Sequence, residues 1–224
     1  MDPQVYKSTK LGDITLLQQV VIEDSSRLMK QTPQKNTTLH VAVKFCHTEF
    51  VKEMYSALLQ CYTSLEGDMD YSRSLSLITQ VNLEDDTALH VAAREGHASI
   101  AQYLIEKIKP WPFDHDVESG NSSPVVPKKI RMRKKSFHTA LHETMRRNDL
   151  EMVKLLTEAN PDLGHPNYDA DVEGHGESPL YLAVRDGRLD ILNQIFLICP
   201  SPAHSGPYGR TTLHVAIVER RLGI

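Results

Sequence analysis

A six-residue motif, Thr-x-Leu-His-x-Ala, recurs along the chain and restricts how it can fold more than any other feature. Its copies begin at Thr37, Thr87, Thr139, Ser178 and Thr211. The fourth is looser, because Ser-Pro opens it and Tyr replaces His. Self-similarity of this kind is typical of solenoids, in which each repeat packs only on its neighbours. The repeat motif therefore predicts a row of similar stacked units.

Each copy of the repeat motif carries residues that begin and pack a short helix. Thr or Ser caps free backbone N–H groups, Pro179 suits a first turn that needs no N–H, Leu faces the interior, and the small Ala lets helices approach closely. The His side chain is expected to hydrogen-bond to backbone or to the Thr of the next repeat. Gly96 and Gly187 are expected to end first helices, since glycine adopts left-handed backbone easily. The motif residues are Thr37, Leu39, His40, Ala42, Thr87, Leu89, His90, Ala92, Gly96, Thr139, Leu141, His142, Ser178, Pro179, Leu180, Ala183, Gly187, Thr211, Leu213, His214 and Ala216.

A second amphipathic helix is predicted after each of the first four copies. Apolar residues follow the spacing i, i+1, i+4, i+5 of one buried helix face, as in Ile100, Ala101, Leu104 and Ile105. One unit cannot cover this stripe alone, so stacking must supply the core. Burying one Leu or Ile contributes about 1.5–3 kcal/mol. The predicted fold class is all-α, a solenoid of stacked helix-turn-helix units with inter-repeat loops and two long insertions.

The copies are unevenly spaced, at intervals of 50, 52, 39 and 33 residues. Because a stacked unit cannot lengthen internally, we expect the surplus in loops, chiefly at about 61–77 and 109–135. Residues 6–21, with Gly12-Asp13, predict a divergent first repeat. We expect a single domain, 1–224. Its repeats are predicted at about 3–35, 36–85, 86–137, 138–176 and 177–209, with an incomplete one at 210–224.

The repeat motif resembles the T-P-L-H-x-A signature of ankyrin repeats, and other segments resemble plant ankyrin membrane proteins of the accelerated-cell-death and salt-tolerance type. Those segments are Met1-Asp2-Pro3, Gln34–Thr37, Ala92–His97 and Ser201–Pro207. The resemblance, which runs across nearly the whole chain, implies cytosolic repeats that bind proteins in defence or stress signalling. In the whole protein it implies a membrane-spanning region after them. The chain stops after the first helix of a repeat, where we expect an open apolar face, and this favours a fragment or a truncated product.

Composition limits the partners and cofactors that we expect. A net charge of −4 is a poor basis for general nucleic-acid binding, so no nucleic-acid partner is expected. Three scattered cysteines form neither a disulfide framework nor a zinc site, and fit a reducing compartment. No signal peptide is apparent, and the longest apolar stretch is about half the length of a membrane helix. We expect a cytoplasmic chain, on the cytosolic face of a membrane if the whole protein has a membrane region.

Two acidic segments resemble parts of metal sites, but we expect both to be solvated loops. The first, Asp169–Gly174, resembles the start of a calcium loop, yet Leu180 stands where the loop needs a bidentate Glu. The second is Asp114-His115-Asp116 with Glu118. The motif histidines are expected to be structural. Because no nucleophile elbow, P-loop or dinucleotide fingerprint occurs, we predict no catalytic residue, no cofactor and no metal.

Two basic features indicate how a partner could be bound. The run Lys128–Lys135 is read as a solvated loop, with nuclear import or contact with acidic lipid as alternatives. The second is a set of cations that share one position in each repeat and should lie near the ends of first helices. Its members, the basic set, are Lys10, Lys44, Arg94, Arg146 and Arg185. Such cations stabilise helix C-termini; alternatively they form a stripe that attracts an acidic partner, and reversing Arg94 and Arg146 to Glu should then weaken binding without unfolding the stack.

The leading hypothesis is a non-catalytic protein-interaction scaffold in plant defence or stress signalling. Partners would dock on the inner helices and loop tips. One alternative is a nuclear adaptor that uses residues 128–135 for import. Another is the regulatory ankyrin part of a larger membrane protein or of an enzyme.

Overall fold

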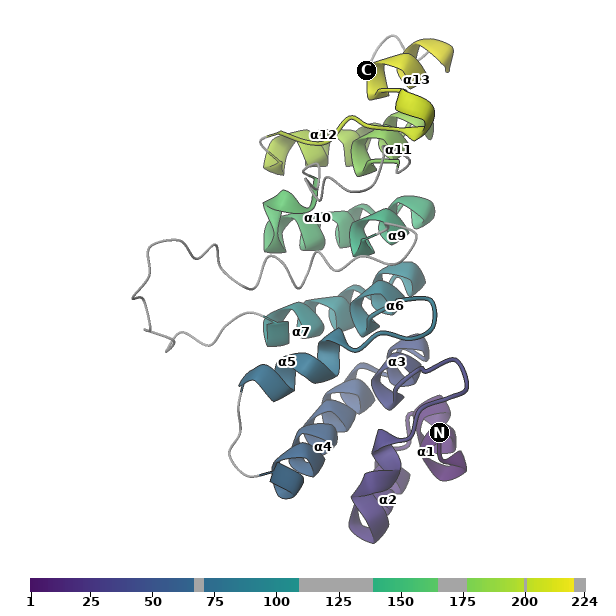
Figure 1. The fold of residues 1–224 in the computed structure, drawn as a ribbon, viewed down its shortest axis with the longest axis vertical. Helices are drawn as coiled ribbons and strands as arrows, with labels where there is room; N and C mark the ends of the chain where they lie inside the picture. Colours follow the sequence, from purple (N-terminus) through teal and green to yellow (C-terminus); the bar gives the residue numbers. More distant parts are fainter. Residues whose placement is uncertain (67–70, 109–138, 165–176, 200, 220–224) are drawn as a thin grey trace, which may run out of the picture. The chain divides into compact units, whose positions relative to one another are not determined.

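The computed structural model describes residues 1–66, 71–108, 139–164, 177–199 and 201–219 of the chain (Figure 1). They belong to two compact units, Met1–Met132 and Arg133–Ile224. Each unit is a stack of short antiparallel helix pairs, which confirms the predicted all-α solenoid. None of the described helices is long and apolar enough to cross a membrane.

In unit 1, the first helix of each pair stacks on the first helix of the next, and the second helices form a parallel layer. The row of first helices is α1, α3 and α6, and α2, α4 and α7 lie beside them in a second row (Figure 1). The bounds are α1 Pro3–Leu11, α2 Ile14–Asp24, the 3-10 turn η1 Ser25–Met29, α3 Thr38–Lys44, α4 Thr48–Glu66, α5 Tyr71–Thr79, α6 Ala88–Glu95 and α7 Ala98–Ile108.

Unit 2 repeats the same plan. The row of first helices is α9, α11 and α13, while α10 packs on α9 and α12 packs on both α10 and α11. The bounds are α9 Ala140–Arg147, α10 Leu150–Ala159, η2 Pro161–Gly164, α11 Pro179–Arg185, α12 Leu189–Ile198, η3 Pro207–Gly209 and α13 Thr212–Val218.

Four helix pairs share one register, counted from the residue that caps the first helix. The second helix begins 11 residues after the cap (37 to 48, 87 to 98, 139 to 150 and 178 to 189). The turn between the helices needs one residue in left-handed backbone, nine residues after the cap. Gly96 and Gly187 supply it as predicted, and Cys46 and Asn148 adopt the same conformation without being glycine.

The predicted apolar stripes form the core. The stripe residues Val51, Leu104, Met152 and Ile195 are all fully buried. After the fourth motif copy the same spacing predicts the stripe Ile191, Leu192, Ile195 and Phe196, but Phe196 on α12 is exposed. Among the described residues, the core thus follows the helical periodicity of the second helices, and Phe196 departs from it.

The first predicted insertion is not a loop. Residues 61–77 fall largely in helices, since α4 runs on to Glu66 and is followed by α5, which packs against α4, α6 and α7. Nothing between Thr48 and Glu66 breaks a helix, because that segment contains no Gly or Pro. Leu75, Leu77 and Ile78 bury enough apolar surface to dock the extra helix. The second predicted insertion, 109–135, lies outside the described residues.

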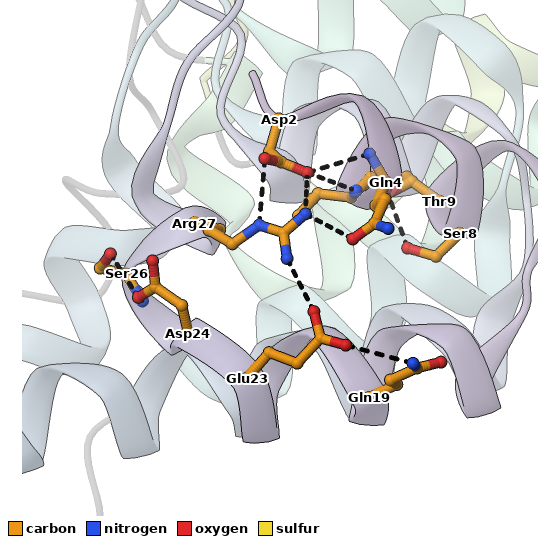
Figure 2. A network of polar contacts seen from close by, with 10 residues as sticks. Asp2, Gln4, Ser8, Thr9, Gln19, Glu23, Asp24, Ser26 and Arg27 are labelled. Carbon is orange, nitrogen blue, oxygen red and sulfur yellow. Dashed lines mark hydrogen bonds and ion pairs between the residues drawn. The ribbon is translucent and has the colours of Figure 1, made fainter.

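An arginine after α2 fixes the N-terminal helix in place (Figure 2). Arg27 donates Nε to Asp2 Oδ2 at 3.0 Å and Nη2 to Asp2 Oδ1 at 2.8 Å, a two-pronged contact, and donates Nη1 to Glu23 at 3.1 Å. Asp2 also caps α1 by accepting the backbone N–H groups of Gln4 and Val5. These bonds, chiefly the one from Arg27, lower the pKa of Asp2 to about 2.

Candidate protein-binding surface

The repeat motif builds a closed hydrogen-bond unit at the start of each first helix. Thr37 Oγ1 accepts from the backbone N–H of His40 at 3.4 Å, and the backbone N–H of Thr37 donates to His40 Nδ1 at 3.3 Å. This is a capping box in which His takes the place of Glu or Gln. Because Nδ1 accepts, the ring carries its proton on Nε2. The same box forms at Thr87, Thr139 and Thr211.

The same histidine ties one repeat to the next. His40 Nε2 donates to the backbone oxygen of Asp86 at 2.8 Å, and His142 Nε2 donates to that of Glu177 at 2.9 Å. Each acceptor lies one residue before the cap of the following repeat. Burial lowers the pKa of His40, which keeps the ring neutral. Both histidines thus make the bond to backbone that is expected of a structural residue.

The fourth copy of the motif has a larger ring at the position of the histidine. Tyr181 stands where the others have His, and it is buried. Its ring lies against Gly206, where any Cβ atom would overlap the ring. Gly206 therefore makes room for the larger side chain, a pairing between distant residues that the motif alone does not reveal.

Short loops ahead of α3 and α6 form a linked platform. Each is closed by a backbone bond, from Thr32 N–H to Asn36 O and from Asn82 N–H to Asp86 O, both at 3.0 Å. Neighbouring loops are joined by Asn82 Nδ2, which donates to Asn36 Oδ1 at 2.8 Å. The loop tips are thus held by hydrogen bonds within and between repeats.

The basic set lies where the sequence predicts, in the last turn of each first helix. Its arginines, however, meet carboxylates. Arg94 binds the buried carboxylate of Asp86, and Arg185 binds Glu177. In both cases the acid lies one residue before the helix cap and eight before the arginine. These arginines close the loop onto its own helix, a role that their position at a helix end did not predict.

Arg146 also has an acid close by: its Nη1 lies 3.9 Å from Oε2 of the buried Glu143. The two lysines of the set differ. Lys10 and Lys44 are exposed, and no ion pair within the described part of the chain involves either. Of the five cations, the lysines are therefore the ones whose charge is available to a partner.

A groove of about 340 Å³ runs between α3 and α6. Its floor is Val41 and Val91, the fifth residues of two motif copies, and Lys44 stands on its wall. Glu84 and Glu95 also line it, so the wall carries both signs of charge. We call it the α3–α6 groove; its lining is Asn36, His40, Val41, Lys44, Asn82, Glu84, Val91, Arg94 and Glu95. The repeat pattern does not reveal the two acids, because the preceding repeat has Gln34 and Phe45 at the equivalent positions.

Several predicted features cannot be placed. The acidic segments at 114–118 and 169–174 and the basic run 128–135 lie outside the described residues. Among the residues that are described, no cluster of three His, Cys, Asp or Glu side chains could hold a metal ion.

Comparison with known proteins identifies the repeat. Residues 6–116 match the family model for ankyrin repeats (3 copies), and residues 137–167 match the model for a single ankyrin repeat. The two matches together cover more than half of the chain. Among solved structures, the chain is similar to the ankyrin repeat domain of Bcl-3, described as a unique member of the IkappaB protein family. That likeness has a TM-score of 0.69 and 19% identity, and covers 99% of this chain and 82% of the other. At this identity it shows the fold alone.

Proposed function

Since the chain belongs to the ankyrin-repeat proteins, we propose that it is a non-catalytic scaffold that binds a protein partner through the α3–α6 groove. Repeat solenoids generally use such extended surfaces for binding. The observation that supports this proposal best is the groove itself: an apolar floor with an exposed lysine and two carboxylates on its wall, beside the hydrogen-bonded platform of loops.

The groove is suited to binding because its frame is already fixed. The capping boxes and the His40–Asp86 bond hold the backbone beneath it. A preorganised surface loses less conformational entropy when a partner binds, so more of the contact energy appears as affinity. The side chains on its wall are spared from packing, which leaves them for recognition.

The charges on the wall specify the partner's chemistry. Lys44 favours an acidic group, while Glu95 and the exposed Glu84, which also lies 3.8 Å from Arg94 Nη1, favour a basic one beside it. Complementary charge mainly sets specificity and the rate of association. We therefore expect a segment that carries charges of both signs, in place of the purely acidic partner that a basic stripe would attract.

Lys44→Glu is the variant that tests this function. Lys44 is exposed, so its reversal should leave the fold intact while placing a third carboxylate in the groove. Proteins retained by the immobilised wild-type chain should bind the variant at least about tenfold more weakly, or ~1.4 kcal/mol. Dissociation constants for each retained protein, measured by biolayer interferometry, check this.

The matched control is Lys154→Glu, which makes the same charge change at an exposed position of a second helix, α10. It should leave the affinity unchanged. Equal affinity of wild type and Lys44→Glu would refute the groove as the binding site. Arg94→Glu is unsuitable as a probe, because it would set a second carboxylate against the buried Asp86 and destabilise the repeat.

On the sequence resemblance alone, we also propose that the scaffold acts in plant defence or stress signalling, on the cytosolic face of a membrane. A fluorescent fusion of the whole protein, followed in plant cells before and after an immune elicitor, tests this location. Nuclear accumulation that is lost when residues 128–135 are neutralised would favour the nuclear adaptor. Reading the transcript past codon 224 tests the alternative of a larger membrane protein or enzyme.

A further inference from the structure

The repeat that begins with α3 lacks the ion pair that closes the loop in two other repeats. In the repeats of α6 and α11, an acid before the cap binds the arginine eight positions later, as Asp86 binds Arg94. The α3 repeat has Asn36 and Lys44 at these two positions. Both line the α3–α6 groove, and within the described part of the chain no hydrogen bond joins them. Two side chains that elsewhere close the loop are therefore left to the groove.

The Asn36 amide is held in one orientation by a chain of hydrogen bonds. Asn82 Oδ1 accepts the backbone N–H groups of Glu84 at 2.9 Å and of Asp86 at 3.0 Å. Because a backbone N–H can only donate, the oxygen of the Asn82 amide must face both groups, and its Nδ2 must donate to Asn36 Oδ1. Asn36 Nδ2 is then the end that remains: it makes no hydrogen bond with the described residues and is open to solvent. The groove wall thus presents an N–H donor of fixed orientation.

A neutral oxygen suits this donor better than a carboxylate. The formal charges of the groove lining cancel, since it contains two cations and two acids: Lys44, Arg94, Glu84 and Glu95. Lys35, on the same loop as the donor, is exposed but lies outside this lining. Glu84 belongs to the chain of hydrogen bonds that orients the donor, so a carboxylate bound there would lie near a like charge. Main-chain carbonyls are neutral acceptors, and an extended segment leaves them unpaired, whereas a helix or sheet uses them.

We infer that Asn36 Nδ2 donates to a main-chain carbonyl of an extended segment of the partner protein, while Lys44 binds an acidic side chain of the same segment. This inference rests on the proposed binding role of the α3–α6 groove. The helix that separates the two residues, α3, has seven residues and is therefore about 10 Å long. An extended chain spans that length with about three residues. The acidic residue should accordingly lie about three positions from the carbonyl that Asn36 binds.

Asn36→Asp tests this inference, because it removes the donor and keeps the rest of the network. One oxygen of the new carboxylate still accepts from Asn82 Nδ2, and the other replaces Nδ2 and repels a carbonyl oxygen. The probes are synthetic peptides, selected from a phage-displayed random library on the wild-type chain and weakened by Lys44→Glu. Their dissociation constants, measured by calorimetry, should rise at least about tenfold in Asn36→Asp. Gln34→Glu makes the same change from amide to carboxylate on the same loop, outside the groove lining, and should bind like the wild type.

Ester-for-amide replacement along the peptide identifies the acceptor. An ester carbonyl accepts more weakly, so one position, about three from the acidic residue, should weaken binding to the wild type but not to Asn36→Asp. In NMR spectra of the wild type, the side-chain NH₂ signals of Asn36 should shift when the peptide is added, a readout that needs no variant. Circular dichroism and the urea midpoint should be the same for wild type, Asn36→Asp and Gln34→Glu, which separates lost binding from lost folding.

The outcomes distinguish this inference from the proposed function. Peptides that are weakened by Lys44→Glu but bind Asn36→Asp as tightly as the wild type overturn the inference and leave the groove as the binding site. Equal weakening by Asn36→Asp and Gln34→Glu also overturns it. So does alanine replacement that assigns the acceptor to an Asn or Gln side chain of the peptide. If Lys44→Glu weakens no selected peptide, the proposed function fails and the inference fails with it.

Discussion

At the residue scale, one imidazole of the Thr–His pair both caps its own helix and hydrogen-bonds to the next repeat. His40 receives the backbone N–H of Thr37 on Nδ1 and donates Nε2–H to the next repeat. Both bonds require the neutral ring with its proton on Nε2. A second proton would have to sit on Nδ1, where it would face the N–H that Nδ1 now accepts.

This bonding predicts that acid weakens the fold through His40. Burial lowers its pKa in the folded state, whereas the unfolded chain takes up a proton near pH 6.5. The contribution of the neutral ring is therefore fully present above pH 6.5 and is lost as the pH falls from there through the lowered folded pKa. Free energies of unfolding in urea at pH 7.5 and 5.5 should fall more for the wild type than for His40→Gln. Parallel pH dependence in the two chains would contradict this.

The positions of the arginines could be predicted from the sequence, but their carboxylate partners could not. Their place at helix ends follows from the repeat, because equivalent positions share local structure. Their partners do not, since Asp86 and Glu177 lie eight residues earlier across a cap. An acid before the cap and an arginine eight residues later were both visible in the sequence. Only the backbone path of the loop shows that they meet.

At the element scale, the turn between paired helices is the most constrained point. Gly12 ends α1 with φ of 67°, and His47 at the start of α4 covers it, donating Nε2 to Lys10 O at 3.3 Å. A Cβ on Gly12 would lie 2.6 Å from His47 Cγ. Glycine is therefore required at this position for two reasons: its φ is positive, and His47 leaves no room for a Cβ atom.

Gly12→Ala should therefore destabilise the chain through both effects. Gly209→Ala is the matched control, because Gly209 has a similar φ of 71° but nothing within 4 Å of its Cβ position. The strain of left-handed alanine costs about 1 kcal/mol in each. The overlap with His47 should make Gly12→Ala the costlier change by about 1 kcal/mol or more, as measured by urea unfolding. Equal losses would mean that His47 moves aside freely.

Elements were predictable where local rules decide them. Caps, first helices and apolar stripes follow from the motif and its periodicity, and they were predicted correctly. Residues 61–77 were predicted wrongly, because the surplus was assigned to loops from repeat length. The buried Leu75, Leu77 and Ile78 show instead that the segment has its own apolar face to dock. The repeat boundaries stay predictions.

At the scale of the whole molecule, the extensive contacts between described helices join neighbouring repeats within each unit, so damage should stay local. Asp2→Asn removes the charge that Arg27 binds at the start of α1. Amide hydrogen exchange followed by mass spectrometry should speed up in α1 and α2 and remain unchanged in α9–α13. The effect should be clear at pH 7 and should diminish as the pH falls from 3.8 through the folded-state pKa of about 2, because Asp2 then loses its charge in the wild type too. A uniform rise in exchange along the chain would point to one cooperative unit.

The shared register of the helix pairs has a consequence for how such a chain changes length. Cap, left-handed residue and second helix keep fixed separations of nine and 11 residues in four repeats, while the intervals from cap to cap vary from 33 to 52. Insertions and deletions are thus tolerated only downstream of the second helix start. Extra residues can be inserted there in the course of evolution without disturbing the cap, the turn and the start of the second helix that precede them. The same places would accept an epitope tag or a fluorescent protein, whereas a single residue added between cap and turn would misalign a whole repeat.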